Sequence, residues 1–374
     1  MGIAIVAGTR PEILKLAPVY RSLKTAGLEP VWIATGQHGD LAQQAEESIG
    51  IVPDMRLPGG WDPRSLTDLT AGLLGQLGLW ISECSPRAVL VQGDTASAYS
   101  GALAAHLHRV PVGHVEAGLR SGDPANPFPE ESFRRLIAPI TDFHFAPTRL
   151  AEKNLRLEGI KARRIWITGN PIIDTVLDMA AHTRHPAVLD ALKPGERLVL
   201  LTAHRRENWG EGISSICSAA RQLVERHDDI RIVFPAHSNP RVRETVLAEL
   251  GEAERIHVTE PLSYPEFIAV LKASHLVLSD SGGVQEEAPS FDVPVLVLRE
   301  TTERQEAVDA GVARLVGTDP EKIVREASRL LSEKAAHREM ADRNNPFGDG
   351  QASRRIAEIL KAELSPARAG AGAA

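Results

Sequence analysis

The sequence contains few of the residues and motifs that mark the more specialised classes of protein. Only two of its 374 residues are cysteines, and both lie in apolar stretches of helical pattern, so we expect buried thiols rather than a disulfide. No cysteine–histidine spacing matches a zinc site. The chain has no G-x-G-x-x-G turn after its first predicted strand and no Walker A lysine loop. A metal site, a redox dinucleotide and an NTPase are therefore disfavoured, and we expect no cofactor.

Positive charge is not in excess either. The chain has 42 lysines and arginines against 49 acidic residues, a formal net charge of -7. This balance argues against a protein that binds nucleic acid or a membrane surface. The apolar run 3–7 is too short to cross a membrane, and no charged leader segment or cleavage site precedes it. We therefore expect a cytoplasmic protein with neither a membrane nor a nucleic-acid partner.

Short apolar runs alternate with amphipathic segments along most of the chain. The runs are mostly continuous, as in parallel strands that are buried on both faces. Repeated strand–helix alternation predicts an α/β fold in which two Rossmann-like, doubly wound parallel-sheet domains face a cleft. The predicted strands are 2–7, 30–35, 87–92, 111–115, 142–146, 164–168, 197–202, 230–235, 255–258, 275–279, 293–298 and 312–316. The predicted helices are 11–26, 65–83, 96–108, 129–139, 148–157, 211–226, 240–250, 264–273 and 319–333.

Glycine and proline interrupt this alternation between residues 169 and 195. We place the domain boundary there, with an N-terminal domain over 1–169 and a C-terminal domain over 170–350. The last residues are small and rich in glycine and alanine, so we expect a disordered tail over 364–374.

Polar side chains follow most of the predicted strands, at the sheet edge where doubly wound folds bind their ligands. Arg10 and Lys15 follow the first strand at a helix start and could face an anion, although for either residue alone an ordinary surface charge is favoured. Asp94 ends another strand but would also serve as the N-cap of the next helix. Glu116 ends a buried strand, where a carboxylate needs either a salt bridge or a function.

Two acidic residues begin the helix near residue 130. We predict that Glu130 faces inward, whereas Glu131 suits the dipole of the helix N-terminus. Arg134 follows one helical turn later and adds positive charge to the same region.

In the second half, basic residues follow the strands. His204 precedes Arg205 and Arg206, which together resemble an anion site; a solvated basic face is the alternative. His237 follows the next strand, where it could equally be a residue that packs a loop.

The most informative segment is 279–287, which follows a clear apolar strand and opens a helix. Around Ser281, the glycines Gly282 and Gly283 allow a phosphate to approach the backbone N–H groups. Glu287 lies one helical turn later, where its carboxylate could accept hydrogen bonds from ribose hydroxyls. A glycine-softened helix start with a surface acid is the alternative. Arg304 adds positive charge nearby, so the set favours a nucleotide sugar as ligand.

These segments together resemble the non-hydrolysing UDP-N-acetylglucosamine 2-epimerases across nearly the whole chain. The resemblance implies a GT-B-like fold, a C-terminal helix over 351–363 that packs back on the first domain, and a homodimer. The matching segments are GTRPE (8–12) with Lys15, TGQH (35–38), GDT (93–95), GHVEAGLRSGD (113–123), FPEE (128–131), TGN (168–170), HRREN (204–208), SDSGGVQEEAP (279–289), TTERQEAV (301–308), GT (317–318) and NPFGDGQAS (345–353).

The activity that the resemblance implies is an isomerase reaction used in polysaccharide biosynthesis. UDP-N-acetylglucosamine and UDP-N-acetylmannosamine are interconverted at C2 by elimination and re-addition of UDP, through a 2-acetamidoglucal intermediate. The implied catalytic residues are Asp94, Glu116, Glu130 and His204. The implied substrate-binding residues are Arg10, Lys15, Arg134, Arg205, His237, Phe267, Ser281, Gly282, Gly283, Glu287 and Arg304.

Three other functions share parts of this pattern. A hydrolysing epimerase would release free N-acetylmannosamine and UDP, and a GT-B glycosyltransferase would need an acceptor site. A catalytically inactive nucleotide-sugar binding module would be expected to lack some of the four catalytic residues, and all four are present.

Overall fold

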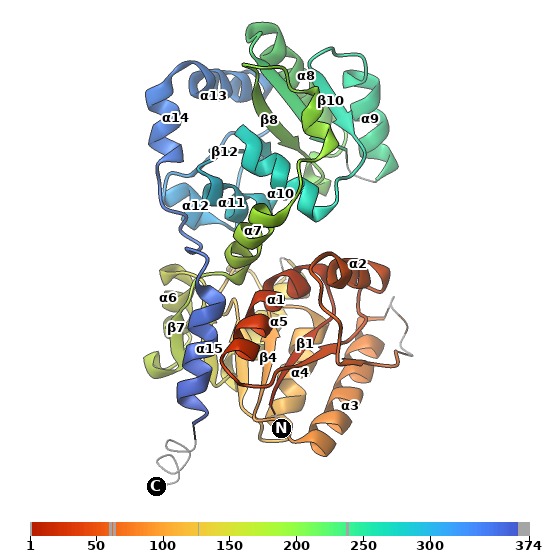
Figure 1. The fold of residues 1–374 in the computed structure, drawn as a ribbon, viewed down its shortest axis with the longest axis vertical. Helices are drawn as coiled ribbons and strands as arrows, with labels where there is room; N and C mark the ends of the chain where they lie inside the picture. The colour runs from red at the N-terminus through yellow and green to blue at the C-terminus, as the bar shows by residue number, and fades with distance from the viewer. Residues whose placement is uncertain (1, 60–61, 63–64, 126, 237–238, 366–374) are drawn as a thin grey trace. The chain divides into compact units, whose positions relative to one another are not determined.

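The computed structural model describes residues 2–59, 62, 65–125, 127–236 and 239–365 (Figure 1). The chain divides into two compact units. Unit 1 comprises Met1–Thr175 and Phe347–Ala374, and unit 2 comprises Val176–Pro346. Each unit is built on a parallel β-sheet with helices between successive strands, which confirms the predicted fold class.

The sheet of unit 1 has seven strands in the order β3-β2-β1-β4-β5-β6-β7, and every neighbouring pair is parallel. Its central strands are apolar and fully buried, as expected for strands covered on both faces. The strands are β1 (Ile3–Ala7), β2 (Val31–Ala34), β3 (Met55–Arg56), β4 (Ala88–Gln92), β5 (Val112–Val115), β6 (Phe143–Ala146) and β7 (Ile165–Ile167).

Helices cover the sheet of unit 1. Leu73 and Leu77 of α3 join residues of α4 and of the central strands in one hydrophobic cluster. The C-terminal helix α15 packs against α1, the first helix of the chain (Figure 1). The helices are α1 (Arg10–Thr25), α2 (Asp40–Ser48), α3 (Leu66–Cys84), α4 (Ala96–Leu107), α5 (Glu130–Ile140), α6 (Arg149–Leu157), the 3-10 turn η1 (Ala162–Arg164) and α15 (Ala352–Glu363).

The sheet of unit 2 has six parallel strands in the order β10-β9-β8-β11-β12-β13. They are β8 (Arg197–Thr202), β9 (Ile230–Pro235), β10 (Ile256–Thr259), β11 (Ser274–Ser279), β12 (Val295–Val297) and β13 (Ala313–Leu315). The helices are α8 (Glu211–Arg226), α9 (Pro240–Leu250), α10 (Tyr264–Ala273), α11 (Gly282–Glu287), α12 (Gln305–Asp309), α13 (Pro320–Ser332) and α14 (Lys334–Ala341), with 3-10 turns η2 (Ala187–Ala191), η3 (Arg206–Asn208) and η4 (Ala288–Phe291). Helix α7 (Pro171–His182) begins in unit 1 and continues into unit 2.

All twelve predicted strands are present, with ends that differ by about two residues at most. Besides the 3-10 turns, the prediction omitted five elements, namely α2, β3, α7, α12 and α14. Both cysteines are free thiols, and Cys217 is buried whereas Cys84 is partly exposed. None of the helices in the described ranges is long and apolar enough to cross a membrane.

The unit boundaries differ from the predicted domain boundaries. The first unit ends at Thr175, inside α7, and the chain returns to it at Phe347. Hydrogen bonds explain this return, because the N–H of Asn170 donates to the carbonyl of Phe347 at 2.7 Å. Asp174 accepts from the N–H groups of Ala352 and Ser353, which begin α15. Of the predicted tail, residues 366–374 lie outside the described ranges.

Candidate functional site

Glu116 directly follows β5 and is held on both of its carboxylate oxygens. Its Oε1 accepts from Lys15 Nζ at 2.6 Å and from Asn170 Nδ2 at 2.9 Å, and its Oε2 accepts from Gln92 Nε2. The residue is 6% exposed and has a φ of 65°, a left-handed conformation that is unusual for a non-glycine residue. Lys15 is therefore no ordinary surface charge, and Glu116 has the ion-pair partner that a buried carboxylate requires.

Asp94 lies at the same carboxyl edge of the sheet, after β4. It does not cap the following helix: Thr95 is the N-cap of α4, and its hydroxyl accepts from the N–H of Ala98 at 3.0 Å. The Asp94 carboxylate instead forms an ion pair with Arg134 of α5 at 2.5 Å. The same guanidinium group also forms an ion pair with Glu131 at 3.1 Å, so Arg134 contacts both acids.

Glu131, rather than Glu130, is the more buried of the two acids that begin α5. Its side chain is fully buried and accepts from the N–H of Ser121 and from Arg135, each at 3.0 Å. Burial alone would raise the pKa of Glu131, but the Ser121 N–H and the two arginines hold it below its ordinary value. Glu130 is half-buried, and its Oε2 has no hydrogen-bond partner within the described part of the chain. Oε2 of Glu130 is thus a buried acceptor without a protein partner in these ranges, whereas both oxygens of Glu131 are occupied.

A further carboxylate, Glu12, was not assigned a role in the sequence analysis. It is fully buried at the start of α1 and accepts from the N–H groups of Gly8 at 3.0 Å and Thr9 at 2.7 Å. The hydroxyl of Thr95 donates to its other oxygen at 2.5 Å. Burial raises the pKa of Glu12 to about 7, although these hydrogen bonds act in the opposite direction. Glu12 thus connects the β1–α1 turn, which carries the exposed Arg10, to the residue beside Asp94.

His114 supports the turn that carries Asp94. The histidine is buried in β5, and its Nε2 lies 2.7 Å from the carbonyl oxygen of Gly93. Burial lowers the pKa of His114 to about 3, so the ring is neutral and donates to that carbonyl.

In unit 2, the glycine turn after β11 lies beside two arginines. A Cβ atom at Gly282 would lie 3.4 Å from the guanidinium carbon of Arg304 and 3.6 Å from Nη2 of Arg205. Ser281 precedes this turn and is the N-terminal flanking residue of α11. Two positive charges and a backbone without side chains are a suitable combination for a phosphate.

Two buried glutamates near this turn accept hydrogen bonds from neighbouring side chains. Arg304 donates to Glu286, whose side chain is almost fully buried, at 2.8 Å. Glu287 is 7% exposed and accepts from the Tyr264 hydroxyl at 2.8 Å, so it is not a surface acid. Glu287 is thus a buried, hydrogen-bonded carboxylate one helical turn after Gly283, as expected for a group that accepts hydrogen bonds from ribose hydroxyls.

His204 follows β8 and lies against Asp280, which follows β11. Its Nδ1 is 3.2 Å from Asp280 Oδ1, and its side chain is 38% exposed. Of the remaining predicted residues, Phe267 is half-buried on α10, and His237 lies outside the described residues. The structure therefore brings together two sets at strand ends: Asp94, Glu116, Lys15 and Arg134 in unit 1, and His204, Arg205, Gly282 and Arg304 in unit 2.

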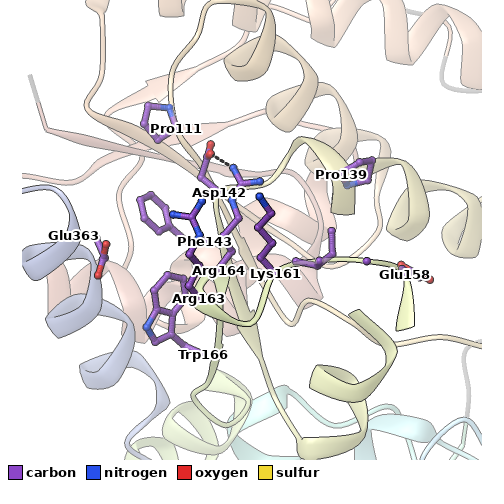
Figure 2. A pocket seen from close by; sticks show the side chains of 12 residues that line it. Pro111, Pro139, Asp142, Phe143, Glu158, Lys161, Arg163, Arg164, Trp166 and Glu363 are labelled. Carbon is purple, nitrogen blue, oxygen red and sulfur yellow. Dashed lines mark hydrogen bonds and ion pairs between the residues drawn. The ribbon is translucent and has the colours of Figure 1, made fainter. Parts of the chain in front are cut away.

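A separate cavity of about 700 Å³ lies in unit 1, and its lining holds none of the predicted site residues. It lies where β6 and β7 begin, at the edge opposite Asp94 and Glu116, and Phe143 and Trp166 contribute to its wall (Figure 2). Within the described ranges, no group of three or more histidine, cysteine or acidic residues is arranged to hold a metal ion.

Comparison with known proteins identifies the family. Residues 21–361 match the family model described as UDP-N-acetylglucosamine 2-epimerase. The chain is 43% identical over 363 residues to the UDP-N-acetylglucosamine 2-epimerase of Bacillus subtilis, and the alignment covers 96% of this chain and 94% of that protein. The chain belongs to the UDP-N-acetylglucosamine 2-epimerase family.

Two solved structures that are similar to the chain contain a nucleotide or a nucleotide sugar. The S. aureus MnaA structure with UDP has a TM-score of 0.88 and 39% identity, covering 97% of this chain and 96% of that one. The UDP-GlcNAc 2-epimerase of Neisseria meningitidis, solved with UDP-GlcNAc, has a TM-score of 0.86 and 37% identity, covering 96% and 99%. These neighbours confirm the resemblance to the epimerase family that the sequence motifs indicated.

Proposed function

We propose that this member of the epimerase family interconverts UDP-N-acetylglucosamine and UDP-N-acetylmannosamine without hydrolysis to a free sugar. The observation that carries the proposal is the placement of Asp94 and Glu116 after the neighbouring strands β4 and β5, with Arg134 and Lys15 as their ion partners. Glu130 begins α5, the helix that carries Arg134. Removal and return of a proton at C2 requires such acid–base groups.

The residues of unit 2 are suited to the UDP part of the substrate. Arg205 and Arg304 beside Gly282 supply charge and an accessible backbone for a diphosphate, and the buried Glu287 supplies an acceptor for ribose hydroxyls. The relatives solved with UDP and with UDP-GlcNAc support this assignment. His237 and Phe267 remain proposed contacts in this unit.

The proposed reaction is an elimination followed by a re-addition. The C1–O bond breaks and UDP leaves with the bonding electron pair, while a base takes the C2 proton and a C1–C2 double bond forms. Return of a proton to the opposite face of C2, with UDP re-adding at C1, gives the epimer. Arginine side chains, which include Arg10, stabilise the charge on the departing diphosphate.

Among the three carboxylates, Glu130 is the one we propose for proton transfer. Both oxygens of Glu116 accept from side chains of the protein, and Asp94 is paired with Arg134. Glu130 Oε2 is shielded from solvent and has no protein partner within the described ranges, so a proton taken from C2 would satisfy it.

The test is to incubate the purified protein with UDP-N-acetylglucosamine in deuterium oxide and record proton NMR spectra. Deuterium at C2 together with UDP-N-acetylmannosamine is the expected result. Free N-acetylmannosamine with UDP would instead identify a hydrolysing epimerase. An unchanged spectrum with UDP-N-acetylglucosamine shown to bind would contradict the proposal.

We also propose a cytoplasmic homodimer that acts without a metal or a redox cofactor and supplies a precursor of polysaccharide biosynthesis. The support is the family resemblance, together with the exposed leucines Leu79 of α3 and Leu107 of α4.

A further inference from the structure

Asp280 is a fully buried carboxylate whose hydrogen bonds converge on the loop after β8. Its oxygens accept from the N–H groups of His204 and Arg205, each at 2.9 Å. They also accept from Asn208 Nδ2 at 2.9 Å. The acid at the end of one strand therefore fixes the loop that follows the neighbouring strand, and this loop carries His204.

Asp280 also contacts the imidazole ring of His204. Nδ1 lies 3.2 Å from Asp280 Oδ1, and the side chain of His204 is 38% exposed whereas that of Asp280 is not exposed. Burial would raise the pKa of Asp280, but hydrogen bonds from the His204 ring, Arg205 and the His204 backbone hold it below its ordinary value. Asp280 is thus ionised near neutral pH and can only accept hydrogen bonds.

An ionised Asp280 determines the tautomer of His204. A carboxylate oxygen beside Nδ1 requires a hydrogen on that nitrogen, so the lone pair of the neutral ring is on Nε2. The same carboxylate stabilises the ring when it is protonated, as an orienting acid does in other acid–base pairs.

We propose that Asp280 is a positioning residue that fixes Nδ1–H of His204 and makes Nε2 the nitrogen that exchanges a proton with the substrate. This assignment rests on the proposed function. When UDP leaves, Nε2–H of the protonated His204 ring gives its proton to an oxygen of the departing diphosphate. The neutral ring takes that proton back when UDP re-adds at C1.

The first test is a double-mutant cycle on kcat. We expect Asp280→Asn to lower kcat about 10- to 100-fold, by analogy with carboxylates that orient a metal-ligating histidine through its other ring nitrogen. The Kd of UDP should change by less than about threefold. In a His204→Ala background the same substitution should cost less than about threefold, because Asp280 then has no ring to orient. Equal losses in both backgrounds would overturn the proposal.

A matched control separates positioning of the ring from anchoring of the loop. Asn208→Ala removes one hydrogen bond between the loop and Asp280 but leaves the ring contact in place. Under our proposal Asn208→Ala retains most of the wild-type kcat, whereas Asp280→Asn does not. A loss as large as that of Asp280→Asn would mean that Asp280 acts only as a loop anchor.

The second test reads the tautomer directly and does not depend on the activity. Nitrogen NMR of histidine-labelled protein, with the His204 signals assigned by their loss in His204→Ala, should show the Nδ1–H tautomer in the wild type and a mixture in Asp280→Asn. An unchanged tautomer in Asp280→Asn would overturn the inference. A wild type that retains the Nδ1–H tautomer but produces no epimer would contradict the proposed function and leave the orienting contact established.

Discussion

Lys15 and Glu116 lie 101 positions apart and form a buried ion pair at 2.6 Å. Removing one partner of such a pair leaves an uncompensated charge, which typically costs about 3–5 kcal/mol. We therefore expect Lys15→Met to lower the free energy of unfolding by roughly 3 kcal/mol in urea denaturation. The double variant Lys15→Met/Glu116→Gln should recover part of this loss. A double variant less stable than either single variant would show that the pair is not coupled as described.

Glu12 gives a prediction about pH. Its pKa is about 7 in the folded protein against an ordinary 4.5, so the folded state retains a proton that the unfolded state releases as the pH rises. The stability from Glu12 is therefore complete below pH 4.5 and is lost as the pH rises through about 7. By linkage this loss is roughly 3 kcal/mol.

The variant Glu12→Gln, which cannot ionise, should lack this loss. Urea denaturation of both proteins between pH 5 and 8 should show the wild type losing stability relative to the variant as the pH rises. Parallel stability curves would contradict the raised pKa.

At the same scale, the sequence indicated residue types but not their partners. Strand-end position and charge are enough to single out Asp94 and Glu116, and the helical spacing from Gly283 singles out Glu287. That Glu116 pairs with Lys15 depends on two segments brought together by the fold, which no local pattern encodes. The sequence therefore left salt bridge and function equally open for Glu116. Glu12 was overlooked because a glutamate near a helix start is expected to interact with the helix dipole in solvent.

At the scale of elements, strands were predicted more completely than helices. A buried strand is a continuous apolar run, which is visible in the sequence. Helix α7 was omitted because Gly169, Asn170 and Pro171 together indicated a break in the chain. In the structure Pro171 is the first residue of the helix, where its missing N–H costs nothing.

The same segment explains how α15 is attached. The Asp174 carboxylate accepts from Ala352 N at 3.2 Å and from Ser353 N at 2.9 Å, so a side chain of α7 caps another helix. Asp174→Ala should cost about 1–2 kcal/mol of stability, as for other lost caps. It should also speed amide hydrogen exchange in α15. Asp178→Ala, an exposed position of the same helix, is the control and should leave α15 exchange unchanged. Equal exchange in both variants would refute the cap.

At the scale of the whole molecule, α3 and α4 leave Leu79 and Leu107 exposed on unit 1. Helix α3 has two charged residues, Asp68 and Glu83, among its 19. Its buried side includes Leu73 and Leu77, whereas Leu79 is 68% exposed. Leu107 at the end of α4 is 65% exposed, and the neighbouring His108 lies against Gly78. These exposed leucines mark a candidate face for a second copy of the chain.

The proposed homodimer can be tested on this face. Light scattering after size exclusion should give about twice the 40.5 kDa mass of one chain. The double variant Leu79→Arg/Leu107→Arg should elute as a monomer, because paired copies of one face would place like charges together without solvent. Leu157→Arg is the control, since Leu157 is 76% exposed on α6, and it should remain dimeric. A monomeric wild type would refute the dimer. A dimeric double variant would show that the interface does not include Leu79 and Leu107.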